Sequence, residues 1–255
     1  MPTPRLAFLR RATLGFAGFG VSLLYCLGRV MQQAATPGQR RSGTIARDTA
    51  RVMSRLACRG ADMEVRVVDG ERLESSQPCV YIANHQSFVD YPVLARIFPA
   101  RTVVVGKAEI GRMPVIGSLF RATGNVLLAR GDSKGASRTL EDLAARLRSG
   151  GTSVWMFPEG TRRKDDSAML PFKSGAFRIA ALAGVPIVPV VVSSLKPHID
   201  LASRQLERTT VTIRVLAPRT MPEHYPGLKA AMEETRQDMI LAFRSMATGT
   251  ASLHH

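Results

Sequence analysis

The sequence is poor in cysteine, and the cysteines it has are widely spaced. Only three occur in 255 residues, Cys26, Cys58 and Cys79. They are too few and too irregularly placed for a disulfide framework. No group of cysteines and histidines has the spacing of a metal site either. We therefore expect reduced, structural cysteines and no bound metal.

Acidic residues are nearly absent from the first quarter of the chain. Residues 1–60 contain ten arginines and a single acid, Asp48, and so carry +9 of the net charge of +15. A surplus of this size indicates an acidic partner such as anionic lipid or nucleic acid. No nucleic-acid-binding motif or platform of stacking aromatic residues accompanies the charge. Anionic membrane lipid is therefore the expected partner.

Charge of either sign is missing from Ala12 to Gly28, between two arginines. As a helix this stretch would span about 26 Å, slightly less than the ~30 Å hydrocarbon core of a bilayer. We expect a helix that is half inserted in a membrane. The alternatives are a secretory signal peptide, which lacks a cleavage site here, and a soluble core helix. The glycines at 15, 18 and 20 weaken the latter unless close packing compensates for their cost.

A second, amphipathic helix is expected over residues 43–60, after a break at Thr36, Pro37 and Gly38. Apolar residues recur on one face of it and arginines on the other: Ile45, Thr49, Val52, Met53 and Leu56 against Arg47, Arg51, Arg55 and Arg59. In a membrane interface the apolar face would meet acyl chains and the arginines would meet lipid phosphates. Alternatively, this is a solvated charged face of a helix packed on the domain. Residues 1–60 are predicted to form a membrane-docking helical hairpin.

From residue 61 to about 250, short runs rich in valine and isoleucine alternate with helical patterns. Strands are expected at 63–68, 78–83, 102–106, 125–129, 153–157, 185–192 and 210–216. Helices are expected at 91–98, 113–122, 133–149, 174–184 and 228–246. This alternation predicts one α/β domain with a mostly parallel sheet and helices on both faces. Ligands of such sheets bind beyond the carboxyl ends of the strands.

The segment NHQSFVD follows one of these strands and places His85 five residues before Asp90. A tight loop entering a helix would bring the carboxylate back to the imidazole, where it orients the ring and stabilises its protonated form, which makes a general base. Alternatively, Asp90, alone or with Ser87, only caps the helix. A carboxylate at a suggestive spacing is not found near the other histidines, His198, His224, His254 and His255.

The segment FPEGTR, residues 157–162, follows a second strand. Arg162 and Lys107 are suited to hold a phosphate, and Gly160 lets the main chain approach a ligand. Taken alone, the segment is equally a strand-end turn with a surface glutamate and arginine. The chain has no G-x-S-x-G elbow and no cysteine in these segments, so a covalent serine or cysteine hydrolase has little support. We expect the substrate itself to supply the reacting hydroxyl.

Four motifs in this order, HxxxxD within NHQSFVD, then GKAEIGRMPVIG, FPEGTR and VPIVPV, resemble the glycerolipid acyltransferases of the 1-acyl-glycerol-3-phosphate acyltransferase type. The resemblance covers roughly residues 60–195. It implies direct transfer of a fatty acyl group from a thioester of coenzyme A or acyl carrier protein to the hydroxyl of a lysophospholipid, with no cofactor beyond this co-substrate. It also implies a site: His85 as base, Asp90 as its partner, Lys107 and Arg162 at the acceptor phosphate, and Glu159, Gly160 and Thr161 shaping the acceptor pocket.

The resemblance also bears on location and acceptor. Similar bacterial enzymes carry an N-terminal two-helix membrane motif, which agrees with the hairpin and implies the cytoplasmic face of a bacterial inner membrane. VPIVPV, residues 185–190, looks like a strand on the donor side or is plain core. In one departure, VLLAR has Ala129 before Arg130, where many relatives have an acid. Arg130 is still expected at the headgroup, but a different lysolipid, such as lyso-ornithine lipid, is an alternative acceptor. A non-catalytic module that binds anionic lipid or nucleic acid is the alternative to an enzyme.

Overall fold

Seven strands form a single sheet in the computed structural model, which describes residues 4–35, 42–128, 133–163, 169–196, 198–200, 203–222 and 225–250. The strands are β1 (Met63–Val68), β2 (Val80–Ala83), β3 (Thr102–Lys107), β4 (Val126–Leu128), β5 (Ser153–Met156), β6 (Ile187–Val192) and β9 (Thr209–Val215). Their order is β1-β9-β6-β2-β5-β3-β4. Neighbouring strands are parallel except β6 and β9. The prediction of a mostly parallel sheet is confirmed.

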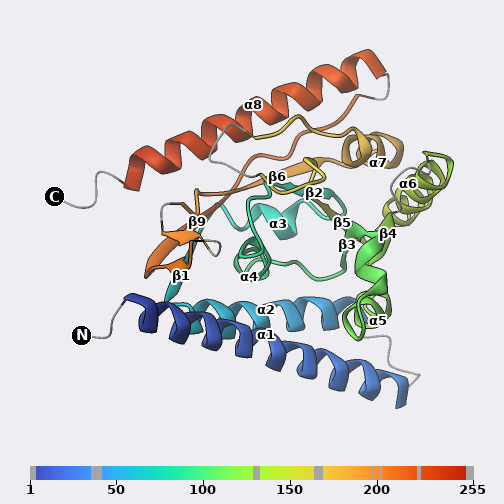
Figure 1. Cartoon of the computed structure of the whole chain (residues 1–255). Coiled ribbons are helices and arrows are strands. Elements are labelled where there is room, and N and C mark those ends of the chain that lie inside the picture. Colours follow the sequence, from blue (N-terminus) through green and yellow to red (C-terminus); the bar gives the residue numbers. More distant parts are fainter. Residues whose placement is uncertain are drawn as a thin grey trace.

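Helices cover both faces of this sheet (Figure 1). They are α3 (Arg72–Ser75), α4 (Asp90–Leu94), α5 (Ile116–Ala122), α6 (Ser133–Arg148), α7 (Gly175–Ala183) and α8 (Tyr225–Thr250), with a short 3-10 helix η1 (Ala108–Arg112). Strand β2 shows how the core is divided. Val80 and Ile82 face the cluster formed with α6, α7 and α8, whereas Tyr81 and Ala83 face the cluster formed with α3 and α4. Side chains of a strand alternate between faces, so β2 is buried on both.

The short helices α3 and η1 were not expected from the sequence, and two further features of the domain differ from the expectation. The helix expected at 91–98 ends at Leu94, where the bonding pattern tightens to three-residue spacing: the N–H groups of Arg96 and Ile97 bond to the carbonyls of Val93 and Leu94. Pro99 follows soon after and disfavours further helix. A small hairpin, β7 (Ile199–Asp200) with β8 (Gln205–Leu206), was not expected, because two-residue strands carry no periodic signal.

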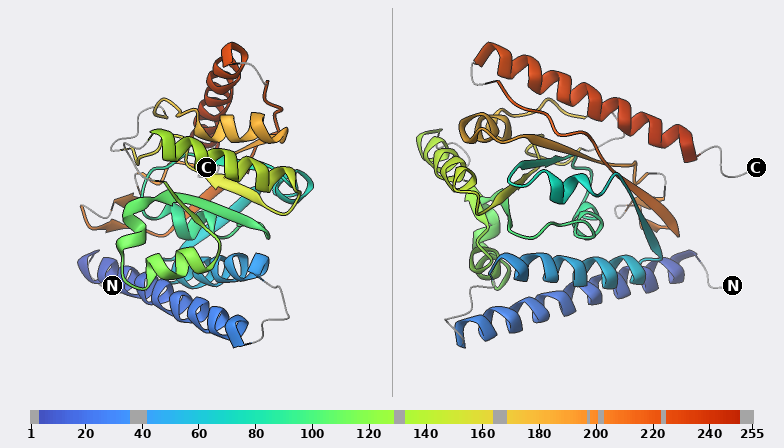
Figure 2. Two further views of the ribbon diagram at one scale, coloured as in Figure 1. Left: turned by 90° about the vertical axis from the view of Figure 1, so that its right-hand side faces the viewer. Right: turned by 180° about the vertical axis from the view of Figure 1, so that it is seen from behind.

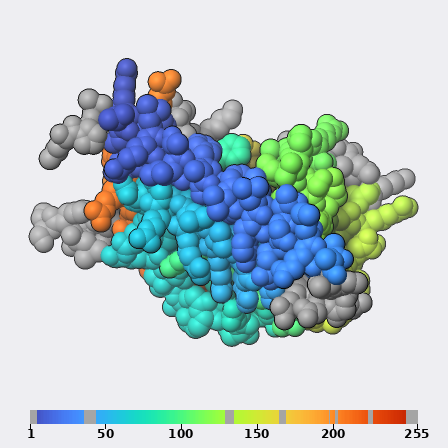
Figure 3. Space-filling view, turned by 90° about the horizontal axis from the view of Figure 1, so that it is seen from below, coloured from blue at the N-terminus to red at the C-terminus, as the bar shows by residue number. Residues whose placement is uncertain are grey.

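The N-terminal helices α1 (Pro4–Ala35) and α2 (Ser42–Gly60) lie side by side along one face of the molecule (Figures 1 and 3). Figure 2 shows α8 on the opposite side of the sheet. Helix α1 has 32 residues, which corresponds to about 48 Å. It therefore extends beyond the uncharged stretch at both ends. The predicted break at residues 36–38 lies outside the described residues.

Glycines let α1 and α2 approach closely. A Cβ atom on Gly18 would lie 2.7 Å from the Leu56 carbonyl carbon, and one on Gly60 would lie 2.6 Å from that of Leu14. By contrast, a Cβ on Gly20 would meet nothing within 4 Å. Close packing against α2 thus accounts for Gly18 in a helix, whereas Gly20 lies on the outer side.

Helix α1 is the outer member of the pair. Among the described helices it alone is long and apolar enough to cross a membrane, and only 17% of its most apolar window is buried. Large apolar side chains line its exposed side: Leu6, Leu9, Leu14, Phe16, Leu24 and Met31. This argues against the core-helix alternative, because a core helix buries its apolar residues.

Helix α2 is held between α1 and the α/β domain, where it contacts α4, β1 and β3. Ile45, Ser54, Ala57 and Cys58 are buried, whereas Leu56 is exposed beside Arg55 and Arg59. Of the apolar face predicted from the sequence, Ile45 is buried, Thr49, Val52 and Met53 are half-buried and Leu56 is exposed. The expected contact of this face with acyl chains is therefore wrong for Ile45 and stays a prediction for Leu56. Arg11 of α1 adds an ion pair of 2.9 Å with Asp62 at the start of the domain.

Candidate active site

His85 and Asp90 meet where β2 ends and α4 begins. Nδ1 of His85 lies 2.8 Å from Oδ2 of Asp90, and the carboxylate is fully buried. The same oxygen accepts the main-chain N–H groups of Gln86 at 2.6 Å and Ser87 at 2.9 Å. The predicted loop geometry is confirmed. Asp90 is the first residue of α4 and bonds backwards to the loop, and the N-cap residue Val89 makes no side-chain bond to the helix, so the capping alternative is wrong.

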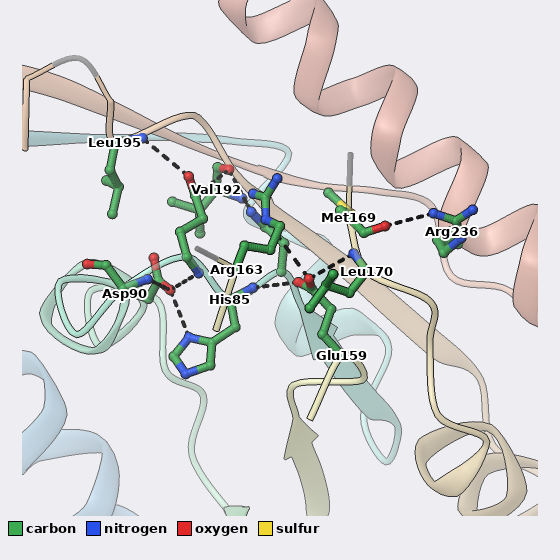
Figure 4. A network of polar contacts seen from close by, with 12 residues as sticks. His85, Asp90, Glu159, Arg163, Met169, Leu170, Val192, Leu195 and Arg236 are labelled. Atoms are coloured by element: carbon green, nitrogen blue, oxygen red, sulfur yellow. Dashed lines mark hydrogen bonds and ion pairs between the residues drawn. The ribbon is translucent and has the colours of Figure 1, made fainter. Parts of the chain in front are cut away.

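Two aromatic rings enclose the imidazole of His85, which is 7% exposed. Phe157 stacks on it with centroids 4.1 Å apart, and Tyr91 meets it edge-on at 5.6 Å. Asp90 occupies Nδ1, so Nε2 is the nitrogen on the side away from the carboxylate (Figure 4). With Nδ1–H donated to a carboxylate, Nε2 is the atom that can take up a proton.

The main chain of His85 is fastened to the segment after β5. Its N–H donates to Oε1 of Glu159 at 2.9 Å, and its carbonyl accepts the N–H of Arg163 at 3.0 Å. The other carboxylate oxygen of Glu159 accepts the N–H of Leu170 at 3.0 Å (Figure 4). These bonds join NHQSFVD to FPEGTR, as expected for two motifs at the carboxyl ends of adjacent parallel strands.

Glu159 and Arg163 form a buried pair behind the loop. Nε of Arg163 lies 3.9 Å from Oε2 of Glu159, and both side chains are almost fully buried. Burial raises the pKa of Glu159, and the N–H bonds from His85 and Leu170 and the charge of Arg163 oppose that rise. The guanidinium of Arg163 lies over the ring of Phe243 from α8. Glu159 thus holds the main chain of His85 and Leu170 in place. Its predicted contact with the acceptor substrate stays a prediction.

Asn84 and Gln86, which were not among the predicted site residues, fasten the histidine loop to a third strand. The amide of Asn84 makes two bonds with the main chain of Val192, at 2.8 and 3.0 Å. Gln86 donates to the carbonyl of Ser193 at 3.0 Å. The sequence does contain a sign of this role, because polar residues flank His85 directly after an apolar strand. All six residues of β6 are buried, which makes the VPIVPV stretch part of the core.

The other predicted site residues that the structure describes follow or end strands whose carboxyl ends lie at this edge of the sheet. Arg162 is exposed, with its guanidinium 3.7 Å from the ring centroid of Phe88. Two residues before Arg162, Gly160 adopts a positive φ of +67 in the turn after β5. Thr161, between them, is exposed. Lys107 is exposed at the end of β3, at the same edge of the sheet. Ala129 and Arg130 lie outside the described residues.

His198 also has a carboxylate neighbour, which its spacing in the sequence did not indicate. Nδ1 of His198 lies 3.3 Å from a carboxylate oxygen of Glu207, across the β7–β8 hairpin. Sequence spacing did not reveal this pair because the hairpin brings the two residues together. About half of each side chain is exposed, and the pair lies apart from the His85 loop in sequence. Within the described ranges, no group of three His, Cys, Asp or Glu side chains could hold a metal ion.

Known proteins share this sequence pattern. The profile of a family described as Acyltransferase matches residues 64–193. The 1-acyl-sn-glycerol-3-phosphate acyltransferase of Haemophilus influenzae is 41% identical over 142 residues, which are 56% of this chain and 58% of the relative. The Escherichia coli enzyme of that name is 39% identical over 145 residues, 57% of this chain and 58% of the relative. The chain thus spans a little over half the length of these curated relatives.

A solved structure shares the fold. The crystal structure of the 1-acyl-sn-glycerophosphate (LPA) acyltransferase from Thermotoga maritima superposes with a TM-score of 0.67 and covers 92% of this chain and 97% of its own. At 22% identity this likeness concerns the fold. The family profile covers half of the sequence and includes the segments that carry His85, Asp90 and Glu159. The chain belongs to the acyltransferase family.

Proposed function

We propose that this protein transfers a fatty acyl group from an acyl thioester to the hydroxyl of a lysophospholipid, with 1-acyl-glycerol-3-phosphate as acceptor and phosphatidic acid as product. The observation that carries the proposal is the 2.8 Å contact between His85 Nδ1 and a buried Asp90 carboxylate. The names of the relatives support the acceptor. A non-catalytic binding module would have no use for an oriented imidazole of this kind.

The proposed reaction is a direct transfer. Nε2 of His85 takes the proton from the acceptor hydroxyl while the oxygen of that hydroxyl attacks the thioester carbonyl. The tetrahedral intermediate then collapses, the carbon–sulfur bond breaks, and the thiolate receives the proton from the imidazolium. Asp90 stabilises the imidazolium between these steps. A positioned general base of this kind contributes about 10²- to 10⁴-fold to the rate.

Arg162 and Lys107 are proposed to bind the acceptor phosphate. Both side chains are exposed, and both follow strands whose carboxyl ends share the edge where His85 lies. An arginine offers a two-pronged set of donors to phosphate oxygens, and a lysine adds a point charge. We extend the proposal to Arg130, Gly160 and Thr161, which complete the predicted acceptor site.

The donor is proposed to be acyl-CoA or acyl carrier protein, and the location a membrane surface, namely the cytoplasmic face of a bacterial inner membrane. The exposed apolar side of α1 supports membrane attachment, because a large apolar surface on a soluble protein is otherwise unfavourable. Arg55 and Arg59 are exposed on α2, where they can meet anionic lipid headgroups.

Release of free thiol tests the proposal. The purified full chain in mixed micelles receives 1-acyl-glycerol-3-phosphate with a long-chain acyl-CoA or acyl carrier protein, and phosphatidic acid is identified by mass spectrometry. His85→Ala is expected to abolish transfer, whereas His198→Ala, in the exposed pair with Glu207, is expected to retain it. If neither donor releases thiol, or if His85→Ala transfers as fast as the wild type, the proposal is wrong. A panel of lysolipids, including lyso-ornithine lipid, identifies the acceptor.

A further inference from the structure

The exposed ring of Phe88, in the histidine loop, stacks against the exposed guanidinium of Arg162. The Phe88 side chain is 62% exposed, and the guanidinium carbon of Arg162 lies 3.7 Å from its ring centroid. A phenyl ring in this position contributes little to the core. Over its face, however, a guanidinium is attracted to the electron-rich surface and loses much of its freedom to rotate. The contact therefore orders a side chain that would otherwise move in solvent.

Both partners of this stack sit on a fixed main chain. The N–H of Ser87 donates to Asp90 at 2.9 Å, and the N–H of Val89 donates to the Ser87 hydroxyl at 2.9 Å, so the chain is held on both sides of Phe88. The residue after Arg162 is held as well, because the Arg163 N–H donates to the carbonyl of His85. Phe88 is thus placed by the loop that carries the imidazole, and Arg162 by a segment that is bonded to that loop.

Aromatic contacts connect the stack to the imidazole. The ring of Phe88 lies 6.4 Å from that of Tyr91, which in turn lies 5.6 Å from His85 and 6.1 Å from Phe157. Burial raises the pKa of the Tyr91 phenol, and the positive charge of Arg162 opposes that rise. A series of ring contacts therefore links the Arg162 guanidinium to the imidazole of His85.

We infer that Phe88 is a positioning residue that holds the Arg162 guanidinium at a fixed distance from Nε2 of His85. An acceptor that carries a phosphate and, a few bonds away, a hydroxyl can then bind Arg162 through its phosphate while its hydroxyl lies at Nε2 of His85. This rests on the proposed function, because it takes Arg162 as the ligand of the acceptor phosphate. The geometry favours this role over contact with acyl chains, because the guanidinium occupies one face of the ring.

Four variants of the full chain test the inference: Phe88→Leu, Phe88→Tyr, Phe88→Trp and Arg162→Ala. Leucine keeps an apolar side chain but has no π face, whereas tyrosine and tryptophan keep one. We measure the equilibrium dissociation constant of 1-acyl-glycerol-3-phosphate in mixed micelles without donor, and then KM for each substrate and kcat. Phe88→Leu is expected to weaken acceptor binding and to raise its KM by about three- to thirtyfold, with the donor KM unchanged. Tyrosine and tryptophan are expected to restore both values.

Coupling to Arg162 completes the test. In the Arg162→Ala background, Phe88→Leu is expected to have no further effect on acceptor binding, because the partner of the ring is already gone. The inference would be overturned if Phe88→Leu bound the acceptor as tightly as the wild type, or if it weakened acceptor binding equally in the wild-type and Arg162→Ala backgrounds. The proposed function would remain intact in either case. If Arg162→Ala itself leaves acceptor binding unchanged, the phosphate role of Arg162 is wrong and the inference falls with it. Unaltered circular dichroism spectra confirm that each variant is folded.

Discussion

One oxygen of Asp90 serves both the imidazole and the main chain of the loop: Oδ2 lies 2.8 Å from His85 Nδ1 and also accepts the N–H groups of Gln86 and Ser87. The loop and the ring therefore share an anchor. An amide at this position would present either an oxygen or an NH₂ group, and it has no negative charge to stabilise the imidazolium.

Asp90→Asn is accordingly expected to lower kcat by about 10²- to 10⁴-fold, because the ring loses both its charge partner and its fixed tautomer. Initial rates of thiol release measure this. Asp142→Asn makes the same change at an exposed position of α6 and should keep the wild-type rate. Activity of Asp90→Asn within a factor of three of the wild type would contradict the general-base pairing.

The buried carboxyl of Glu159 predicts a pH-dependent stability difference. Burial raises its pKa above the ordinary 4.5, so the folded state holds this proton more tightly than the unfolded state does. Its contribution is fully present below pH 4.5 and is lost as the pH rises through the folded-state pKa. The free energy of unfolding of the wild type relative to Glu159→Gln is therefore expected to fall over this range. Denaturant unfolding of both proteins from pH 4 to 8 measures it, and a difference that does not vary with pH would contradict the prediction.

Gly18 and Gly20 offer a matched pair for the contact between α1 and α2. A Cβ at Gly18 would lie 2.7 and 2.8 Å from the main chain of Leu56 and Ala57, whereas one at Gly20 meets nothing within 4 Å. Gly18→Ala is expected to destabilise the protein by about 1–3 kcal/mol through overpacking. Gly20→Ala should stabilise it by up to about 1 kcal/mol through helix propensity. Denaturant unfolding followed by circular dichroism compares them, and equal effects would mean that the helices are not packed as described.

The exposed side of α1 predicts membrane binding. Phe16 and Leu24 are 69% and 70% exposed, and aspartates there would oppose insertion into an interface. Phe16→Asp with Leu24→Asp is expected to weaken binding to anionic vesicles by tenfold or more, on the order of what the loss of two buried apolar side chains implies. Co-sedimentation measures it. Leu241→Asp, on α8 at the opposite side of the sheet, is the control, and equal effects of the two variants would refute α1 as the anchor.

The cysteines provide a chemical test of the core. Cys79 is fully buried, and burial raises the pKa of its thiol to about 11. At pH 8 roughly one thiol in a thousand is then ionised, and the thiolate is the reactive form. Iodoacetamide is expected to leave Cys79 unmodified in the folded protein and to modify it fully in denaturant, as read by mass spectrometry. Rapid modification in the folded state would show that β2 is accessible.

Local signals explain why much of this fold could be predicted. The buried strands β2, β5 and β6 are continuous apolar runs, which is what a parallel sheet covered on both faces requires. The contact between His85 and Asp90 could also be predicted, because five residues of one loop determine it. The same locality made α1 and α2 visible as helices. The burial of α2 could not be predicted, because it depends on contacts with α1 and with the α/β domain together.

Long-range contacts were beyond the sequence. Glu159 bonds to the main chain of His85 across 74 residues, and Asn84 bonds to Val192 across 108. Both use side chains that sequence alone would place in solvent or in a ligand site. For Glu159 the expectation was an acceptor contact, and the structure shows a buried carboxylate that holds the histidine loop. A polar residue at a strand end serves either purpose, and only the pairing of strands decides between them.

The anchoring of the histidine loop has a consequence for synthesis of the chain on the ribosome. The loop depends on Glu159 after β5 and on the Asn84 contact with Val192 at the end of β6. While the chain is being made, His85 leaves the ribosome more than one hundred residues before Val192 does. The bonds that anchor the loop to the sheet are therefore complete only when β6 has joined it. A nascent chain that ends before Val192 therefore lacks one of the contacts that fix the histidine loop in the finished protein.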